Sequence, residues 1–154
     1  MKLQIVFVGK TTEKYLLEGM DDFINRLSRY VAVTVDVVKA STIKEVKKAM
    51  EEEEGNILAR LQPGDFLVIL DENGSEMTSR HLAVKIQKWM TEGKSRIVFV
   101  VGGAFGITPS LKSKANYILS LSKLTFTHQM VRLLLVEQLY RAMTILRNEK
   151  YHHD

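Results

Sequence analysis

A short polar segment in the last quarter of the chain carries the residues best suited to chemistry. Ser122–His128 holds three hydroxyl groups, a lysine and a histidine, and it separates a short apolar run from a long apolar helix. In open α/β sheets, ligands bind beyond the carboxyl ends of the strands, and the free N–H groups at a helix start favour negative charge. We therefore interpret this segment as a ligand-binding bend, although its residue types do not identify the ligand.

Basic side chains surround the bend. His128 can act as a general base or contact RNA, but a lone histidine at a helix start is more commonly satisfied by backbone or water. Arg132 has no acidic partner at helical spacing, so a phosphate suits it. Arg141 lies four residues after Glu137, which predicts a structural ion pair on one helix face.

A glycine cluster forms a second candidate site. Gly102, Gly103 and Gly106 follow a predicted strand and precede a predicted helix, and glycine lets a ligand approach the backbone closely. The spacing is not GxGxxG, and no carboxylate follows about 20 residues later to hold a ribose, which disfavours a small dehydrogenase. The pattern fits a tight turn and a ligand loop equally well. Asp71, after the strand that ends at Leu70, is more commonly a turn former than a ligand-binding residue.

The last six residues, Glu149–Asp154, have the composition of a frayed terminus. They nevertheless include Tyr151, His152 and His153, which offer stacking and proton-transfer groups for a nucleic-acid base. Adjacent histidines also suit a metal ion, but no third ligand is spaced with them. We therefore expect no metal site.

Five apolar segments and five helical patterns must position these residues. Strands are expected at Lys2–Val8, Val31–Val38, Phe66–Leu70, Arg96–Val101 and Tyr117–Leu121. Helices are expected after a cap at Thr11 or Thr12, after a capping box at Thr42–Glu45 with a kink or split at Gly55, from the 71–75 loop to Gly93, at Thr108-Pro109, and from Gln129 to about Arg147. Strands that are apolar on both faces and alternate with helices predict an α/β fold: a mostly parallel five-stranded sheet with helices on both faces.

Composition narrows the classes of protein. A chain of 154 residues, 45% hydrophobic and 26% charged, fits one globular domain over residues 1–154. No apolar run approaches the roughly 18 residues of a membrane span, and no export signal is visible, so we expect a cytoplasmic protein without a membrane partner. The absence of cysteine excludes disulfides and thiolate chemistry.

Charge and the last helix indicate partners. The net charge is +4, and between Ser110 and Lys150 the acidic residues are Glu137 and Glu149 alone, which favours a nucleic-acid surface in the C-terminal half. The last helix is apolar around nearly its whole circumference, so it must be covered on more than one side. We infer a homodimer, with the second copy supplying part of this cover.

The chain resembles the RlmH-type (YbeA-like) SPOUT methyltransferases over essentially its whole length. The matching segments are MKLQIVFVGK, EGNILARL, FLVILDENG, FVVGGAFG, LSLSKLTFTHQMVRLLLVEQLYRA and the terminal YHH. The resemblance implies methylation of N3 of a pseudouridine in 23S rRNA of the ribosomal large subunit, with S-adenosylmethionine as methyl donor. It also implies a C-terminal trefoil knot, a rare exception to unknotted topology, and a working homodimer.

The resemblance assigns roles to individual residues. The cofactor pocket matches Leu70, Gly102, Leu121, Ser122, Lys123, Leu124, Thr125 and Phe126. The tail of one subunit closes over the cofactor of the other, which makes Tyr151, His152 and His153 residues for the RNA substrate. Our mechanistic hypothesis is that His128 or the partner's His152 takes the N3 proton while Arg132 or Arg141 holds phosphate.

Two positions depart from the family pattern. Thr127 stands where relatives usually have proline, and His153 stands where they have arginine or lysine. The second change makes phosphate binding by the tail dependent on pH. A non-catalytic RNA- or ribosome-binding module that kept the fold remains the alternative function.

Overall fold

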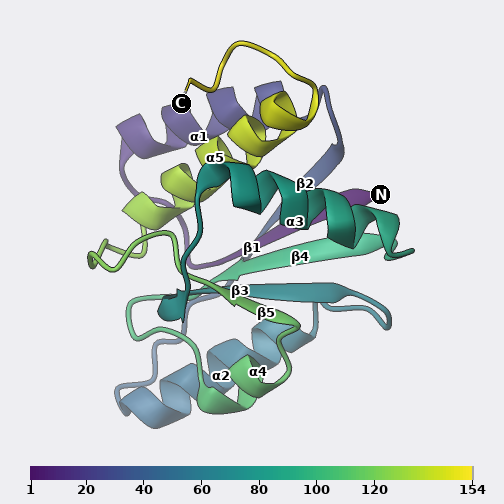
Figure 1. Ribbon diagram of the computed structural model, residues 1–154. Coiled ribbons are helices and arrows are strands. Elements are labelled where there is room, and N and C mark those ends of the chain that lie inside the picture. The colour runs from purple at the N-terminus through teal and green to yellow at the C-terminus, as the bar shows by residue number, and fades with distance from the viewer. Residues whose placement is uncertain (154) are drawn as a thin grey trace.

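The computed structural model describes residues 1–153, within which one sheet of five parallel strands has the order β2-β1-β4-β3-β5 (Figure 1). The elements in chain order are β1 (Lys2–Val8), α1 (Lys14–Leu27), β2 (Ala32–Val38), α2 (Val46–Leu58), β3 (Phe66–Ser75), α3 (Ser79–Thr91), β4 (Arg96–Val101), α4 (Pro109–Ser113), β5 (Tyr117–Leu119) and α5 (Met130–Leu146). Helices α1, α3 and α5 cover one face, and α2 and α4 cover the other (Figure 1). The predicted α/β class, parallel sheet and helices on both faces are confirmed.

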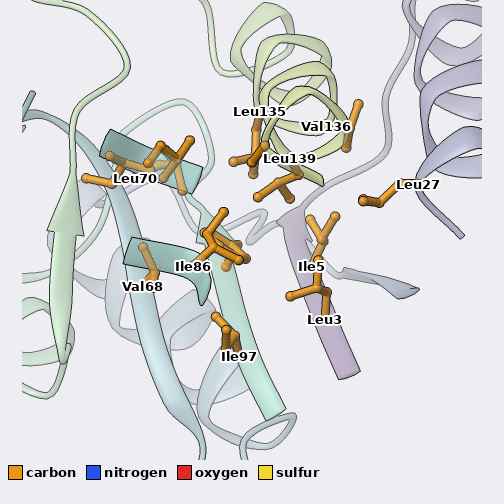
Figure 2. Close-up of a cluster of buried hydrophobic side chains, with 14 of the residues drawn as sticks. Leu3, Ile5, Leu27, Val68, Leu70, Ile86, Ile97, Leu135, Val136 and Leu139 are labelled. Atoms are coloured by element: carbon orange, nitrogen blue, oxygen red, sulfur yellow. The ribbon is translucent and has the colours of Figure 1, made fainter. Parts of the chain in front are cut away.

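The central strands have no solvent face. Leu3, Ile5, Val6 and Phe7 of β1 have no exposed surface, and most of β4 is buried in the same way. A strand covered by helices on both sides is mostly apolar, which explains why its sequence shows no alternation. The exception in β1 is Gln4, which is buried and hydrogen-bonds through its side chain to Thr34 and Asp36 of β2. Figure 2 shows the larger of the two resulting clusters, where side chains of β1, β3 and β4 meet Leu135, Val136 and Leu139 of α5.

Helix α5 lies between α1 and α3 and is covered by its own chain on several sides. The rings of Phe23 in α1 and Tyr140 in α5 are 5.9 Å apart, and the Ser79 hydroxyl of α3 donates to Gln138 Oε1 at 2.7 Å. The apolar circumference of the helix is therefore explained largely within one chain. The homodimer remains a prediction.

Two helix starts differ from the sequence prediction. Helix α1 begins at Lys14 without a threonine cap, because the Thr11 hydroxyl accepts a hydrogen bond from Arg132 instead. Helix α2 begins at Val46, after the expected capping box of Thr42 and Glu45, and Gly55 does not interrupt it. The segment before α2 has no regular structure and bends at Lys44 and Glu45, and Ser41 N donates to the Glu53 carboxylate of the helix at 2.9 Å.

The predicted start of α4 is confirmed. The Thr108 hydroxyl accepts from Leu111 N at 3.1 Å, and Pro109 occupies the first turn. Proline suits this place because the first N–H groups of a helix have no partner within the helix.

Strand β3 continues five residues beyond its predicted end at Leu70, and β5 is two residues shorter than predicted. The extension, Asp71–Ser75, runs beside β5, where Ser120 N donates to Ser75 O at 3.0 Å. A methyl group on Gly74 would lie 2.7 Å from the carbonyl oxygen of Ile118, so only glycine permits this close approach.

Substitution of two glycines tests this packing. Gly74→Ala is expected to lower the free energy of unfolding by about 2 kcal/mol, because backbone must shift to admit the methyl group. The matched control, Gly55→Ala, has open space around it inside α2 and is expected to raise stability by about 0.5–1 kcal/mol. Urea denaturation followed by circular dichroism measures both; a stable Gly74→Ala protein contradicts the tight crossing.

Candidate cofactor and RNA site

A cleft of about 380 Å³ opens at the carboxyl ends of β3, β4 and β5. Its lining includes the apolar strand-end residues Leu70, Val101 and Leu119, and its walls come from the three segments that follow these strands. Seven of the eight residues assigned to the cofactor by resemblance line it: Leu70, Gly102, Leu121, Ser122, Leu124, Thr125 and Phe126. The eighth, Lys123, points elsewhere: its exposed ammonium lies 3.8 Å from Glu76 Oε1.

The polar bend is tied to the extension of β3. The Ser120 hydroxyl donates to the Glu72 carbonyl at 3.1 Å, and the Thr125 hydroxyl donates to the Glu72 carboxylate at 2.8 Å. Leu124 N in turn donates to the Ser122 hydroxyl at 3.0 Å. These bonds replace regular structure, so the bend keeps a defined shape and forms one wall of the cleft.

The glycine cluster is both a tight turn and a wall of the cleft. Gly106 N donates to the Gly103 carbonyl at 3.1 Å, and Gly106 has a φ of 83°, in the left-handed region that favours glycine. A methyl group on Gly102 would lie 3.0 Å from the carbonyl carbon of Gly106. The two interpretations left open by the sequence are therefore compatible.

Charged residues that the sequence did not assign also line the cleft. Lys112 Nζ of α4 lies 2.5 Å from Asp71 Oδ2, and Asp71 Oδ1 accepts from Asn73 N at 3.1 Å. Burial raises the pKa of Asp71. The hydrogen bonds from Lys112 and Asn73 together outweigh this effect, so the pKa lies below the ordinary value. The position of Asp71 after a strand was the available signal, whereas nothing in the sequence placed Lys112 opposite it.

His128 lies at the edge of the cleft and is partly exposed. Burial lowers the pKa of its imidazole, the positive charge of Arg132 lowers it further, and Glu53 opposes both. The resulting pKa is below 6.5, so the imidazole is mainly neutral at pH 7 and able to accept a proton.

Thr127, at the position of the family's proline, supports the start of α5. Its hydroxyl accepts a hydrogen bond from Met130 N at 3.1 Å, and its carbonyl accepts from Val131 N at 3.2 Å. The hydroxyl thus satisfies one of the free N–H groups at the helix start.

The prediction that Arg132 holds an RNA phosphate is wrong, because its side chain has no exposed surface. Its guanidinium donates to the carbonyls of Val8 and Gly9 and to the Thr11 hydroxyl at 2.7–2.9 Å. Burial lowers the pKa of Arg132 to about 10, so the group is still charged at pH 7. Arg132 therefore fixes the loop after β1 to the first turn of α5.

The remaining predicted RNA residues gather in a second cluster beside α5. Arg141 donates to Glu137 at 2.6 Å, which confirms the predicted ion pair, and its Nη1 lies 3.2 Å from His152 Nδ1. The Tyr151 hydroxyl donates to Glu137 at 2.9 Å, and its ring lies 4.7 Å from that of Tyr140. The tail thus folds back onto its own helices (Figure 1), His153 is exposed, and none of these side chains lines the cleft.

Residues 1–153 also lack two features that would indicate other functions. No helix in this range is long and apolar enough to cross a bilayer. No three histidine or carboxylate side chains in the same range gather in a way that suits a metal ion.

Comparison with known proteins gives consistent matches. A family model described as "Predicted SPOUT methyltransferase" matches residues 1–152. The "Ribosomal RNA large subunit methyltransferase H" of Parabacteroides distasonis is 45% identical, and that of Natranaerobius thermophilus is 42% identical, each aligned over at least 99% of both chains. Among solved structures, a probable methylase family protein from Haemophilus influenzae has a TM-score of 0.56 at 16% identity, covering 99% of this chain and 70% of that one, a likeness of fold alone.

Replacement of the buried arginine tests its positioning role. Arg132→Met removes three N–H donors and leaves the carbonyls of Val8 and Gly9 and the Thr11 hydroxyl without this partner. The free energy of unfolding is therefore expected to fall by about 3 kcal/mol. The control, Arg147→Met, removes an exposed guanidinium 5.5 Å from the Tyr30 ring and is expected to cost about 0.5–1 kcal/mol. Equal losses in chemical denaturation would show that Arg132 has no special structural role.

Proposed function

Because the chain belongs to the SPOUT methyltransferase family, we propose that it methylates large-subunit ribosomal RNA, with S-adenosylmethionine as donor and N3 of a pseudouridine in 23S rRNA as acceptor. The observation that carries the proposal is the cleft, which gathers seven of the eight residues expected at the cofactor from three separate segments. The site of action is then the cytoplasm, where ribosomes are found.

The cleft suits the proposed donor in size and chemistry. Its volume of about 380 Å³ falls within the usual range for small-molecule sites, and apolar lining residues such as Leu70, Val101 and Leu121 suit an adenine ring. The glycines of the wall let a ligand approach the backbone closely. The proposed donor has a net charge of +1, because it carries a sulfonium and an ammonium but only one carboxylate. Asp71 and Glu72 supply negative charge at the cleft.

The cofactor supplies an electrophilic methyl group on a sulfonium. In the transfer, a nitrogen–carbon bond forms at N3, the sulfur–carbon bond breaks, and the N3 proton leaves. His128 stands at the cleft in its neutral form and is our candidate for the group that accepts the proton. The fixed walls hold the reactants in line, and such positioning supplies much of the rate in bimolecular transfers.

The tail cluster needs a second copy of the chain to reach the cleft. Arg141 lies on α5, Tyr151 and His152 pack against that helix in the same chain, and none of the three lines its cleft. We therefore keep the homodimer in the proposal, with the partner's tail binding RNA over the cofactor. Exposed apolar side chains at the cleft support this arrangement, since Phe105 is 56% and Leu124 is 70% exposed.

Cofactor binding distinguishes a methyltransferase from the rival function, a non-catalytic RNA-binding module. Titration calorimetry with S-adenosylmethionine is expected to show one site per chain, and mass spectrometry of rRNA from ribosomes lacking the modification is expected to show one added methyl group on a pseudouridine. A protein that binds RNA without heat from the cofactor would establish the module instead. Sedimentation at micromolar concentration tests the dimer independently.

The pH dependence of methyl transfer tests the role of His128. A neutral base is lost when it is protonated, so the single-turnover rate is expected to be flat near pH 7 and to fall at acid pH with an apparent pKa below 6.5. His128→Gln should lower the rate by about 10²–10⁴-fold and remove this acid limb. If His152→Gln removes the limb instead, the proton goes to the tail histidine; if neither does, no histidine acts as base.

A further inference from the structure

The cleft contains an ion pair that none of the assigned roles uses. Lys112 on α4 and Asp71 on the extension of β3 both line the cleft, with Nζ and Oδ2 2.5 Å apart. The side chains are 34% and 15% exposed, so the pair is shielded from bulk water on most sides yet reachable from the cleft. An ion pair in this position is available to a bound ligand.

Both partners have bonding capacity left. Within residues 1–153 the Lys112 ammonium pairs with Asp71, which uses one of its three N–H donors. The Asp71 carboxylate accepts from Lys112 and Asn73, and a carboxylate offers about four acceptor positions. A ligand can therefore add one acceptor to the lysine and one donor to the aspartate without breaking the pair.

The other charged groups of the cleft are committed or are unsuited to a carboxylate. Glu72 accepts from the Thr125 hydroxyl at 2.8 Å and holds the bend in place. His128 is mainly neutral near pH 7 because burial and Arg132 lower its pKa. Among the described residues that line the cleft, Lys112 is thus the only permanent cation.

We propose that the Asp71–Lys112 pair is the subsite for the amino-acid end of the methyl donor, with Lys112 Nζ donating to the donor's carboxylate and Asp71 accepting from its α-ammonium. This inference rests on the proposed function, since it requires an S-adenosylmethionine-type ligand. An α-amino acid carries its ammonium and its carboxylate on the same carbon atom. The protein presents a carboxylate and an ammonium 2.5 Å apart, so each can pair with the opposite charge of the ligand. Charge-assisted bonds of this kind are roughly twice as strong as neutral ones.

Two ligands separate this subsite from the rest of the cleft. S-adenosylhomocysteine has the amino-acid end, whereas 5′-methylthioadenosine has the same adenosine and sulfur but lacks it. Calorimetric dissociation constants are measured for both with the wild-type chain, Lys112→Met, Lys112→Arg and Asp71→Asn. Lys114→Met is the matched control, because Lys114 lies at the end of the same helix, is exposed and does not line the cleft. Thermal melting of each variant reports folding.

Lys112→Met is expected to weaken the binding of S-adenosylhomocysteine by about 10- to 150-fold, the effect of losing one charge-assisted hydrogen bond. Its affinity for 5′-methylthioadenosine should stay within about twofold, since that ligand does not reach the lysine. Lys112→Arg should recover most of the loss, Asp71→Asn should also act selectively on S-adenosylhomocysteine, and Lys114→Met should change neither constant.

Other outcomes overturn the inference. Equal weakening of both ligands by Lys112→Met would show that the pair only supports the fold, and no weakening would show that the amino-acid end lies elsewhere. Equal weakening of both by Asp71→Asn would place the aspartate on the ribose hydroxyls. If the wild-type chain binds neither ligand, the proposed function fails; if it binds both with equal affinity, the subsite fails while the proposed function stands.

Discussion

A buried positive charge imposes the strictest constraint on this structure. Arg132 has no exposed surface, and the Nη1 and Nη2 atoms of its guanidinium donate to two backbone carbonyls and one hydroxyl at and just after the end of β1, up to 124 positions away in sequence. An unpaired charge at this depth costs several kcal/mol, so α5 and the loop after β1 must stay together. Gln129 repeats the connection, since its amide bonds to Lys10 O and Thr12 N at 2.9 Å each. The first turn of α5 is therefore fixed, and with it the position of His128.

The cleft depends on a second set of bonds of the same kind. Glu72 holds the bend through its carbonyl and its carboxylate, and Gly74 lets the extension of β3 pass close to β5. The side chain of Glu72 and the absence of a side chain at Gly74, rather than helix or strand hydrogen bonds, determine where these loops lie. Hydrogen bonds of this kind restrict the conformations of a loop, which reduces the entropy that ligand binding would otherwise cost.

The sequence predicted those features that depend on local pattern. Strands such as β1 and β4 are predominantly apolar because both faces are buried, and Thr108-Pro109 begins a helix because the cap and the proline act locally. The resemblance supplied the cofactor residues, which no periodicity reveals. The failures involve partners distant in sequence: Thr42–Glu45 does not begin a helix because Glu53 draws the preceding segment away, and Arg132 bonds to carbonyls that any sequence would contain. Lys112 was overlooked for the same reason, since only the fold places it opposite Asp71.

The arrangement of β1 has a consequence for biogenesis. This strand precedes the other four in the chain, yet it lies inside the sheet between β2 and β4, and its last residue accepts a hydrogen bond from Arg132 of α5. Contacts of such wide sequence separation delay folding, because the intervening chain must be ordered before they form. Strand β2 covers one edge of β1 early in synthesis, whereas the other edge stays unpaired until β4 has been made. The cleft forms only after α5 has been released from the exit tunnel.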